Sequence, residues 1–260
     1  MRLWNLRGEQ KTVTEALCLE LPDHTVISVT GAGGKTTLIC AWARELASSG
    51  KKTVITTTTH MLLPAQVNDS ADDPYSGIEV IYSDPSCTVP DAGLCDAINR
   101  ALEAGRPAMV VSPDPGRPKK VMSPPEWVSS QIYAGADVVL VEADGSRRMP
   151  LKWPAPWEPA VPEKTDFTVC VAGLSALGCR TEDVMYGTEY IPKPYLRDVA
   201  DEQFVSAVLS SADGGLKGSR GDFRVFLNQA DSDGLLSSAT RIQMLLAVRG
   251  IQSAWGTFKY

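Results

Sequence analysis

One segment near the N-terminus has the residue types and the order of a phosphate-binding loop. An apolar run at residues 26–30 leads into a glycine-rich turn, and Lys35 and a helical pattern follow it. Glycines let backbone amides close around an anion, and the helix directs its positive end to the same place. Lys35 is expected to reach the outer phosphates and Thr36 to offer its hydroxyl to Mg²⁺. The sequence therefore predicts a nucleoside triphosphate site formed by Gly31, Ala32, Gly33, Gly34, Lys35, Thr36 and Thr37.

The loop differs from the full P-loop pattern at one position. Where that pattern begins with a glycine, this chain has Val29. The alternative is a plain strand-to-helix turn with a solvated lysine. Three glycines, a lysine and two hydroxyls in register after a strand favour the phosphate site.

A second candidate element is the apolar run at residues 137–142, which ends in carboxylates. Glu142 and Asp144 share one face if the strand continues, because side chains alternate along a strand. P-loop proteins use an acid at such a strand tip to hold the Mg²⁺ shell or to orient a water. The alternative is an ordinary acidic turn formed by Asp-Gly. Together with the upstream loop, the pattern favours catalytic and metal roles for both acids.

Four threonines and a histidine close another predicted strand, at residues 56–60. Threonine is common in strands, so the run also fits simple β propensity. Its position beside the first loop makes Thr58 or Thr59 a candidate ligand of phosphate or metal, and we take Thr58 as the metal ligand. His60 is the candidate proton acceptor, with a capping or packing role as the alternative.

Near the C-terminus, Asn228 and Asp231 stand in an Asn-Gln-x-Asp pattern after a strand. GTPases read guanine with Asn-Lys-x-Asp at this place, and here Gln229 replaces the lysine. Ser253, after another strand, resembles the loop that closes on the same base. We expect Asn228, Asp231 and Ser253 to contact a purine, with guanine slightly favoured over adenine.

The elements that must position these residues alternate along the chain. This order predicts an α/β fold, P-loop NTPase-like, with a mostly parallel sheet and helices on both faces. We treat residues 1–260 as one domain. Strands are expected at residues 25–30, 52–57, 78–82, 107–112, 137–142, 166–172, 223–228 and 251–256. Helices are expected at residues 10–18, 36–48, 91–104, 124–133, 199–211 and 234–248.

Prolines concentrate in two segments that follow predicted strands. Eleven of the 18 prolines lie between Pro107 and Pro162, and they mark lid loops at residues 113–125 and 143–163. Both loops should emerge at the carboxyl edge of the sheet, where ligands bind. Basic residues gather there, and Arg147 and Lys152 are candidates for anion contacts. Trp153 and Trp157 are candidates for stacking on a flat ligand or for pinning the loop.

Composition excludes several classes of protein. A net charge of −6 and a pI near 5.1 argue against nucleic acid as a main partner. No apolar run approaches the roughly 18 residues of a membrane span, and the first residues lack a signal core, so a cytoplasmic location is expected. Six scattered cysteines and two histidines favour neither a disulfide framework nor a zinc site.

Taken together, these motifs resemble the YqeC family. The segments that carry the resemblance are VTGAGGKTTL at 29–38, TTTTHM at 56–61, VEADGSRRMPLK at 141–152, EPAVP at 158–162 and LNQAD at 227–231. The family is described as P-loop nucleotide-binding accessory proteins of selenium-dependent molybdenum hydroxylases. The resemblance implies that Gly33, Gly34, Lys35 and Thr36 hold phosphate and Mg²⁺. It further places Glu142, Asp144, Arg147 and Lys152 at the reacting end, with Glu158 on the lid.

Three functions compete at this stage. The first is a slow NTPase that uses ATP or GTP with Mg²⁺ to assist maturation of a molybdenum hydroxylase or its cofactor, similar to nickel-insertion GTPases. The second is an ATP-dependent ligase or kinase, since the loop is similar to that of the Mur ligases. The third is a nucleotide-gated adaptor that docks on a client enzyme without hydrolysis. A homodimer is compatible with all three.

Overall fold

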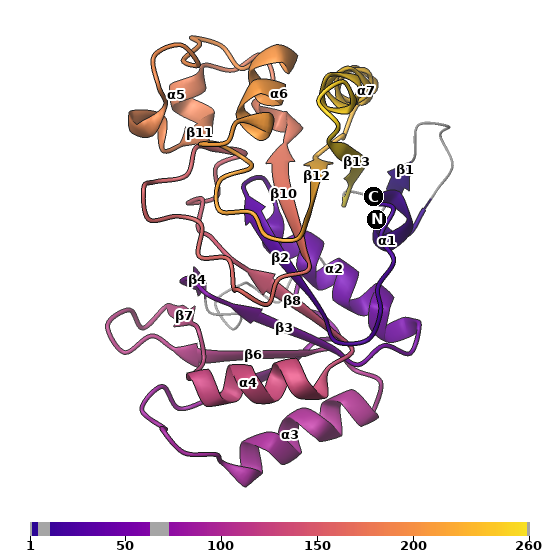
Figure 1. Ribbon diagram of the computed structural model, residues 1–260, viewed down its shortest axis with the longest axis vertical. Coiled ribbons are helices and arrows are strands. Elements are labelled where there is room, and N and C mark those ends of the chain that lie inside the picture. Colours follow the sequence, from indigo (N-terminus) through magenta and orange to yellow (C-terminus); the bar gives the residue numbers. More distant parts are fainter. Residues whose placement is uncertain (1, 5–10, 63–72, 259–260) are drawn as a thin grey trace. The chain divides into compact units, whose positions relative to one another are not determined.

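The computed structural model describes residues 2–4, 11–62 and 73–258 of the chain (Figure 1). It confirms an α/β fold in which most strands run parallel and helices flank the sheet. The chain divides into two compact units. Unit 1 comprises Met1–Glu20, Val29–Lys35 and Asp144–Tyr260, and unit 2 comprises Leu21–Ser28 and Thr36–Ala143. The single domain expected from the sequence stays a prediction.

The sheet of unit 1 is built around three parallel strands. Its order is β1-β13-β12-β10, and the last residues of β2 follow β10. Strand β1 alone runs antiparallel to its neighbour, β13. The strands span Arg2–Trp4 (β1), Thr25–Gly31 (β2), Phe167–Gly173 (β10), Asp222–Asn228 (β12) and Gln252–Thr257 (β13).

Helices pack against the sheet of unit 1 and close its core. The main pair is α6 (Glu202–Ser210) and α7 (Asp233–Ala247), which contributes Phe204 and Leu246 to one buried cluster with Leu227 of β12. Strands β10 and β12 read as continuous apolar runs because both faces of their inner residues are covered. The short elements are α1 (Val13–Ala16), β9 (Leu151–Lys152), η2 (Leu174–Ala176), α5 (Thr181–Val184), β11 (Met185–Tyr186) and η3 (Thr188–Tyr190).

The sheet of unit 2 has parallel strands at its centre and an antiparallel edge. The first residues of β2 are followed by β8, β3 and β6, and β5 pairs with β6 in parallel. Beyond them β7 and β4 run antiparallel. The strands span Thr53–Thr57 (β3), Met61–Leu62 (β4), Glu79–Tyr82 (β5), Ala108–Pro113 (β6), Lys120–Met122 (β7) and Val138–Glu142 (β8).

The helices of unit 2 follow from their apolar spacing. The helices are α2 (Lys35–Ser48), α3 (Ala92–Glu103) and α4 (Glu126–Gly135). Leu38, Trp42 and Leu46 recur every four residues along α2, and all three are buried as the spacing predicts. Asp91 begins α3 by accepting the amides of Gly93 and Leu94.

Two expectations from the sequence need correction. Of the helix expected at residues 10–18, residue 10 lies outside the described residues, and residues 11–18 are helical at Val13–Ala16. This helix begins at a capping box formed by Thr12 and Glu15 and ends before the left-handed Cys18. The proline-rich segments are not wholly loop, since β7 lies in the first and β9 in the second. Both strands are short and have a proline within two residues of each end, so local propensity gave no sign of them.

Candidate nucleotide site

The glycines of the predicted phosphate loop are required by close contacts within unit 1. Gly33 and Gly34 adopt left-handed φ angles of +81° and +114°. A Cβ on Gly33 would lie 2.2 Å from the amide nitrogen of Gly173, and one on Gly34 would lie 2.3 Å from Asn228 Nδ2. Any larger residue would displace the loop from β10 and β12, so these positions need glycine.

The amides of the first three loop residues donate to the chain itself. Gly31 donates to Asp144 Oδ2 at 3.0 Å, Ala32 to the carbonyl of Val171 at 2.8 Å, and Gly33 to that of Met149 at 3.1 Å. All three amides thus have acceptors within the protein, and their contact with a phosphate stays a prediction. The amides of Gly34 and of the first turn of α2 are further candidates for binding an anion, because the first amides of a helix have no acceptor within it.

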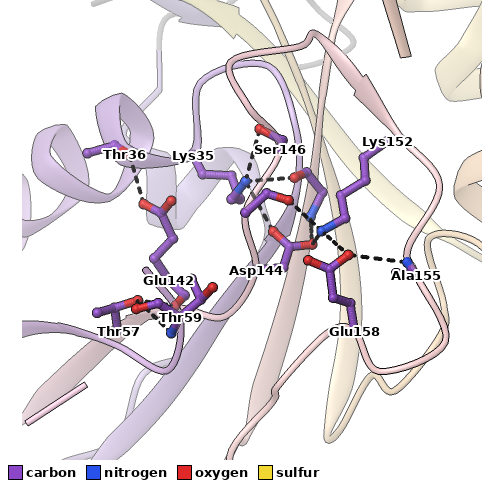
Figure 2. Close-up of polar contacts among 12 residues, drawn as sticks. Lys35, Thr36, Thr57, Thr59, Glu142, Asp144, Ser146, Lys152, Ala155 and Glu158 are labelled. Atoms are coloured by element: carbon purple, nitrogen blue, oxygen red, sulfur yellow. Dashed lines mark hydrogen bonds and ion pairs between the residues drawn. The ribbon is translucent and has the colours of Figure 1, made fainter. Parts of the chain in front are cut away.

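Lys35 lies at the centre of a buried group of charges in unit 1 (Figure 2). Its Nζ donates to the carbonyl of Gly31 at 2.7 Å and lies 3.1 Å from Asp144 Oδ1. The side chain is folded back over its own loop. Only 4% of Lys35 is exposed, so the carboxylate of Asp144 is its counter-ion.

A second lysine approaches the other oxygen of the same carboxylate. Lys152 Nζ lies 3.2 Å from Asp144 Oδ2 and 2.9 Å from Glu158 Oε2, and it donates to the carbonyl of Gly145. Lys35, Lys152, Asp144 and Glu158 form what we call the charge cluster, which carries two positive and two negative groups. The sequence predicted Lys35, Asp144 and Lys152 as site residues and the family resemblance placed Glu158 on the lid; the structure brings the four side chains together. Asp144 acts here as a shared counter-ion.

The turn after Asp144 presents a strained basic pair. Arg147 and Arg148 have left-handed φ angles of 47° and 65°, which residues other than glycine rarely adopt. The guanidinium of Arg147 lies 5.2 Å from the ring centre of Tyr186, and Lys152 Nζ lies 5.5 Å from the same ring. Arg147 is exposed, so it is available to an incoming anion.

Thr36 and Glu142 are paired in unit 2. The hydroxyl of Thr36 donates to Glu142 Oε2 at 2.8 Å, and 7% of Glu142 is exposed. Strand β8 ends at Glu142, so the continuation that would place Asp144 on the same face does not occur. A hydroxyl and a carboxylate in contact are the protein ligands expected for Mg²⁺ beside a polyphosphate.

The threonine run of β3 supports Glu142 from the neighbouring strand. Thr57 Oγ1 donates to the carbonyl of Glu142 at 2.8 Å, and the amide of Thr58 donates to the same oxygen at 3.1 Å. Thr56 Oγ1 donates to the carbonyl of Val110. The sequence pointed to Thr58 and Thr59, but Thr57 is the side chain that fixes the strand tip. The metal role of Thr58 stays a prediction, as does the phosphate role of Thr37, which lies in the first turn of α2.

His60 has a carboxylate partner that the sequence did not suggest. Its Nε2 lies 3.2 Å from Asp114 Oδ2 in unit 2, and 41% of the histidine side chain is exposed. Asp114 follows β6 in the proline-rich segment, and its other oxygen accepts the amide of Gly116. An Asp beside an imidazole favours one ring nitrogen for the proton and leaves the other as the base.

At the end of β12, Asn228 points to the phosphate loop. Its Nδ2 donates to the carbonyl of Gly33 at 2.7 Å, and its Oδ1 accepts the amide of Gln229 at 2.8 Å. Only 3% of Asn228 is exposed. Gln229 turns away with a left-handed φ, and its Oε1 accepts from the hydroxyl of Ser175.

The other two residues predicted to contact a base lie in different settings. Asp231 is exposed, and its Oδ1 accepts from the hydroxyl of Thr257. Ser253 lies inside β13 opposite Val225, in the strand expected at residues 251–256 and not in a loop, and its contact with a purine stays a prediction. The strand runs on to Thr257 because its inner residues are buried.

The two tryptophans of the second proline-rich segment are placed differently. Trp153 is 2% exposed and packs against Tyr195 with ring centres 5.5 Å apart, so it pins the loop. Trp157 is 74% exposed, and its ring lies nearly perpendicular to that of Tyr190 with centres 6.0 Å apart. Only Trp157 keeps a face that a flat ligand or a partner could cover.

A comparison with family models identifies the chain. The model described as YqeC protein matches residues 27–189. The chain belongs to the YqeC family. It is also 35% identical over 164 residues to "Uncharacterized protein YqeC" of Escherichia coli (strain K12), and the match covers 62% of this chain and 57% of that protein. No solved structure matches.

The YqeC match contains most of the site but not all of it. The phosphate loop, Thr36, His60, Glu142 and the charge cluster lie inside residues 27–189, whereas Asn228, Asp231 and Ser253 lie outside. Among the residues that the structure describes, no group of three or more His, Cys, Asp or Glu side chains is arranged to hold a metal. In the same part of the chain, each helix falls short of the length and apolar character of a membrane span.

Proposed function

We propose that this YqeC-family protein binds a purine nucleoside triphosphate, ATP or GTP, together with Mg²⁺ and hydrolyses it slowly. The observation that carries the proposal is the glycine loop that ends in a buried lysine. Gly33 and Gly34 leave no room for side chains, and Lys35 Nζ lies 3.1 Å from the carboxylate of Asp144. A buried ammonium held on a carboxylate can exchange that partner for a phosphate without losing its charge balance.

The residues of unit 2 suit the metal. Thr36 follows Lys35 directly in the chain, and its hydroxyl already contacts Glu142. Mg²⁺ in phosphate sites takes one or two protein oxygens and completes its shell with phosphate oxygens and water. We assign the protein oxygens to Thr36 and Glu142, and we assign Asp144 to the lysines.

Hydrolysis needs positioning and charge neutralisation more than covalent chemistry. Lys35, Lys152 and Arg147 supply positive groups for the developing charge, and Mg²⁺ when bound would neutralise the outer phosphates. We assign His60, positioned by Asp114, to accept a proton from the attacking water. None of these groups forms a covalent intermediate in this scheme.

The biological role proposed is assistance in the maturation of a selenium-dependent molybdenum hydroxylase or its cofactor, which the family resemblance suggests. A nucleotide-gated adaptor is the second candidate. The exposed Trp157 supports the adaptor, because it is next to Glu158 in the chain. Since Glu158 is paired with Lys152, a movement of Lys152 toward a bound phosphate would alter the contacts of this segment. The third candidate, an ATP-dependent ligase or kinase, has no comparable support among the described residues.

Calorimetry with ATP, GTP and their diphosphates, with and without Mg²⁺, tests the proposal. Wild-type protein should bind a triphosphate in a Mg²⁺-dependent manner, and Lys35→Ala should abolish both binding and phosphate release. Arg148→Ala is the matched control, because Arg148 is an exposed basic residue assigned no role. Wild-type protein that takes up no purine triphosphate rejects the function. Binding without phosphate release, with or without the hydroxylase, rejects the NTPase and leaves the adaptor.

A further inference from the structure

We propose that Asn228 is a positioning residue of the phosphate loop and does not read the base. The inference rests on the proposed nucleotide site and assigns different roles in it to Asn228 and Asp231. Asn228 positions the loop that binds the triphosphate of any nucleotide, whereas the exposed carboxylate of Asp231 discriminates between purines. The Asn-Gln-x-Asp pattern had suggested one joint base-reading role for both residues.

The side-chain amide of Asn228 is hydrogen bonded at both its nitrogen and its oxygen. A side-chain amide has two donor hydrogens and one acceptor oxygen. Here Nδ2 donates to the carbonyl of Gly33 at 2.7 Å, and Oδ1 accepts the amide of Gln229 at 2.8 Å. With 3% of the residue exposed, no edge of the amide is presented to a base.

Asn228 also fits closely against the loop. A Cβ on Gly34 would lie 2.3 Å from Nδ2, so the amide packs directly against the loop as well as bonding to it. The bond to Gly33 fixes the peptide that precedes Gly34. Since that peptide supplies the amide of Gly34, moving Asn228 would turn an anion-binding amide.

Asp231 contrasts with Asn228. Asp231 is exposed, and one of its carboxylate oxygens accepts from Thr257 at the end of β13. Such a bond orients a carboxylate that is exposed at the surface of unit 1. A carboxylate held in this way can accept from the N1 and N2 protons of guanine, which adenine lacks.

The test compares ligands with and without a base. Mg²⁺ titrations are run with inorganic tripolyphosphate, ATP and GTP against wild type, Asn228→Ala, Asn228→Asp and Asp231→Asn. Both Asn228 variants should lose affinity for all three ligands by one common factor, roughly tenfold for loss of one buried hydrogen bond. Asp231→Asn should leave tripolyphosphate affinity unchanged and alter the ratio of GTP to ATP affinity.

A double-substitution cycle separates loop positioning from general damage. Gly34→Ala should weaken tripolyphosphate binding strongly, because the added Cβ would lie 2.3 Å from Asn228 Nδ2. Adding Asn228→Ala removes this clash, so it should reduce tripolyphosphate affinity less in Gly34→Ala than in the wild type. Thermal midpoints of all variants are measured alongside as a folding control.

Two results would overturn the inference. One is an Asn228→Asp protein that binds tripolyphosphate with wild-type affinity but no longer binds GTP. The other is that the effects of Gly34→Ala and Asn228→Ala on tripolyphosphate affinity are strictly additive. Wild-type protein that binds none of the three ligands would reject the nucleotide function itself, which keeps the two failures distinct.

Discussion

Thr36 Oγ1 lies 2.8 Å from Glu142 Oε2, and this contact joins the start of α2 to the tip of β8 within unit 2. The backbone carbonyl of Glu142 accepts in turn from the hydroxyl of Thr57, the last residue of β3, and from the amide of Thr58, which follows it. Both the backbone and the carboxylate of Glu142 are therefore held by neighbouring residues of the protein. Such preorganisation would reduce the cost of collecting ligands around the proposed Mg²⁺.

The first prediction concerns this pair. Thr36→Val and Glu142→Gln should each reduce the gain in triphosphate affinity that Mg²⁺ provides by about tenfold or more, because one protein oxygen or its charge is lost. Thr37→Val is the control, since it removes a neighbouring hydroxyl and keeps the backbone amide. Calorimetry with Mg²⁺ and with EDTA checks it. Equal losses under both conditions would mean that the pair supports the loop and holds no metal.

The second prediction concerns Asp144 as the shared counter-ion. Asp144→Asn should leave two buried ammonium groups with one remaining carboxylate, and should destabilise the protein by roughly 3 kcal/mol. Glu158→Gln should cost clearly less, because Glu158 is partly exposed and contacts only one of the two lysines. Urea unfolding measures both. Adding Lys152→Met to Asp144→Asn should restore part of the lost stability. A double variant that is no more stable than Asp144→Asn would contradict the counter-ion role.

The elements that the sequence predicted best are those whose signal is local. Each expected strand is found within about two residues of its place. In β6, β8 and β10 the local signal is a run of buried residues that are mostly apolar or β-branched. The two-residue strands β9 and β11 escaped notice. Within the described part of the chain these two strands pair with each other, although more than 30 residues separate them, and no local pattern encodes such a pairing.

The site was predicted in its residue types but less well in its contacts. Lys35, Thr36 and Glu142 follow from motif order, since a strand, a loop and a helix place them. Asn228 was expected at a base because its motif is local, whereas its partner Gly33 lies 195 residues away. Asp114 was overlooked beside His60 for the same reason, because it follows a different strand.

The third prediction separates the two tryptophans of one segment. Trp153→Ala should destabilise the protein by about 3–5 kcal/mol, because it removes a ring that is 2% exposed from a packed core. Trp157→Ala should change stability by no more than about 0.5 kcal/mol. Chemical unfolding followed by circular dichroism measures both. Similar losses for the two variants would show that Trp157 is also part of the core.

The last prediction uses the buried thiol of Cys170, next to the charge cluster. Burial, reinforced by the negative charge of Asp144, raises its pKa from 9.0 to about 12. Above pH 9 the unfolded chain releases this proton while the folded chain keeps it. The free energy of unfolding should therefore fall with rising pH, by up to about 1.4 kcal/mol per pH unit from this group.

Other groups also titrate in this range, so the difference between variants is the measurement. Cys170→Ala should lose stability less steeply than wild type between pH 9 and 11, whatever its stability at pH 7. Cys179→Ala, which removes an exposed thiol, should follow the wild-type slope. Parallel curves for all three proteins would mean that Cys170 ionises as readily in the folded chain as in the unfolded one, and that its surroundings do not oppose a negative charge.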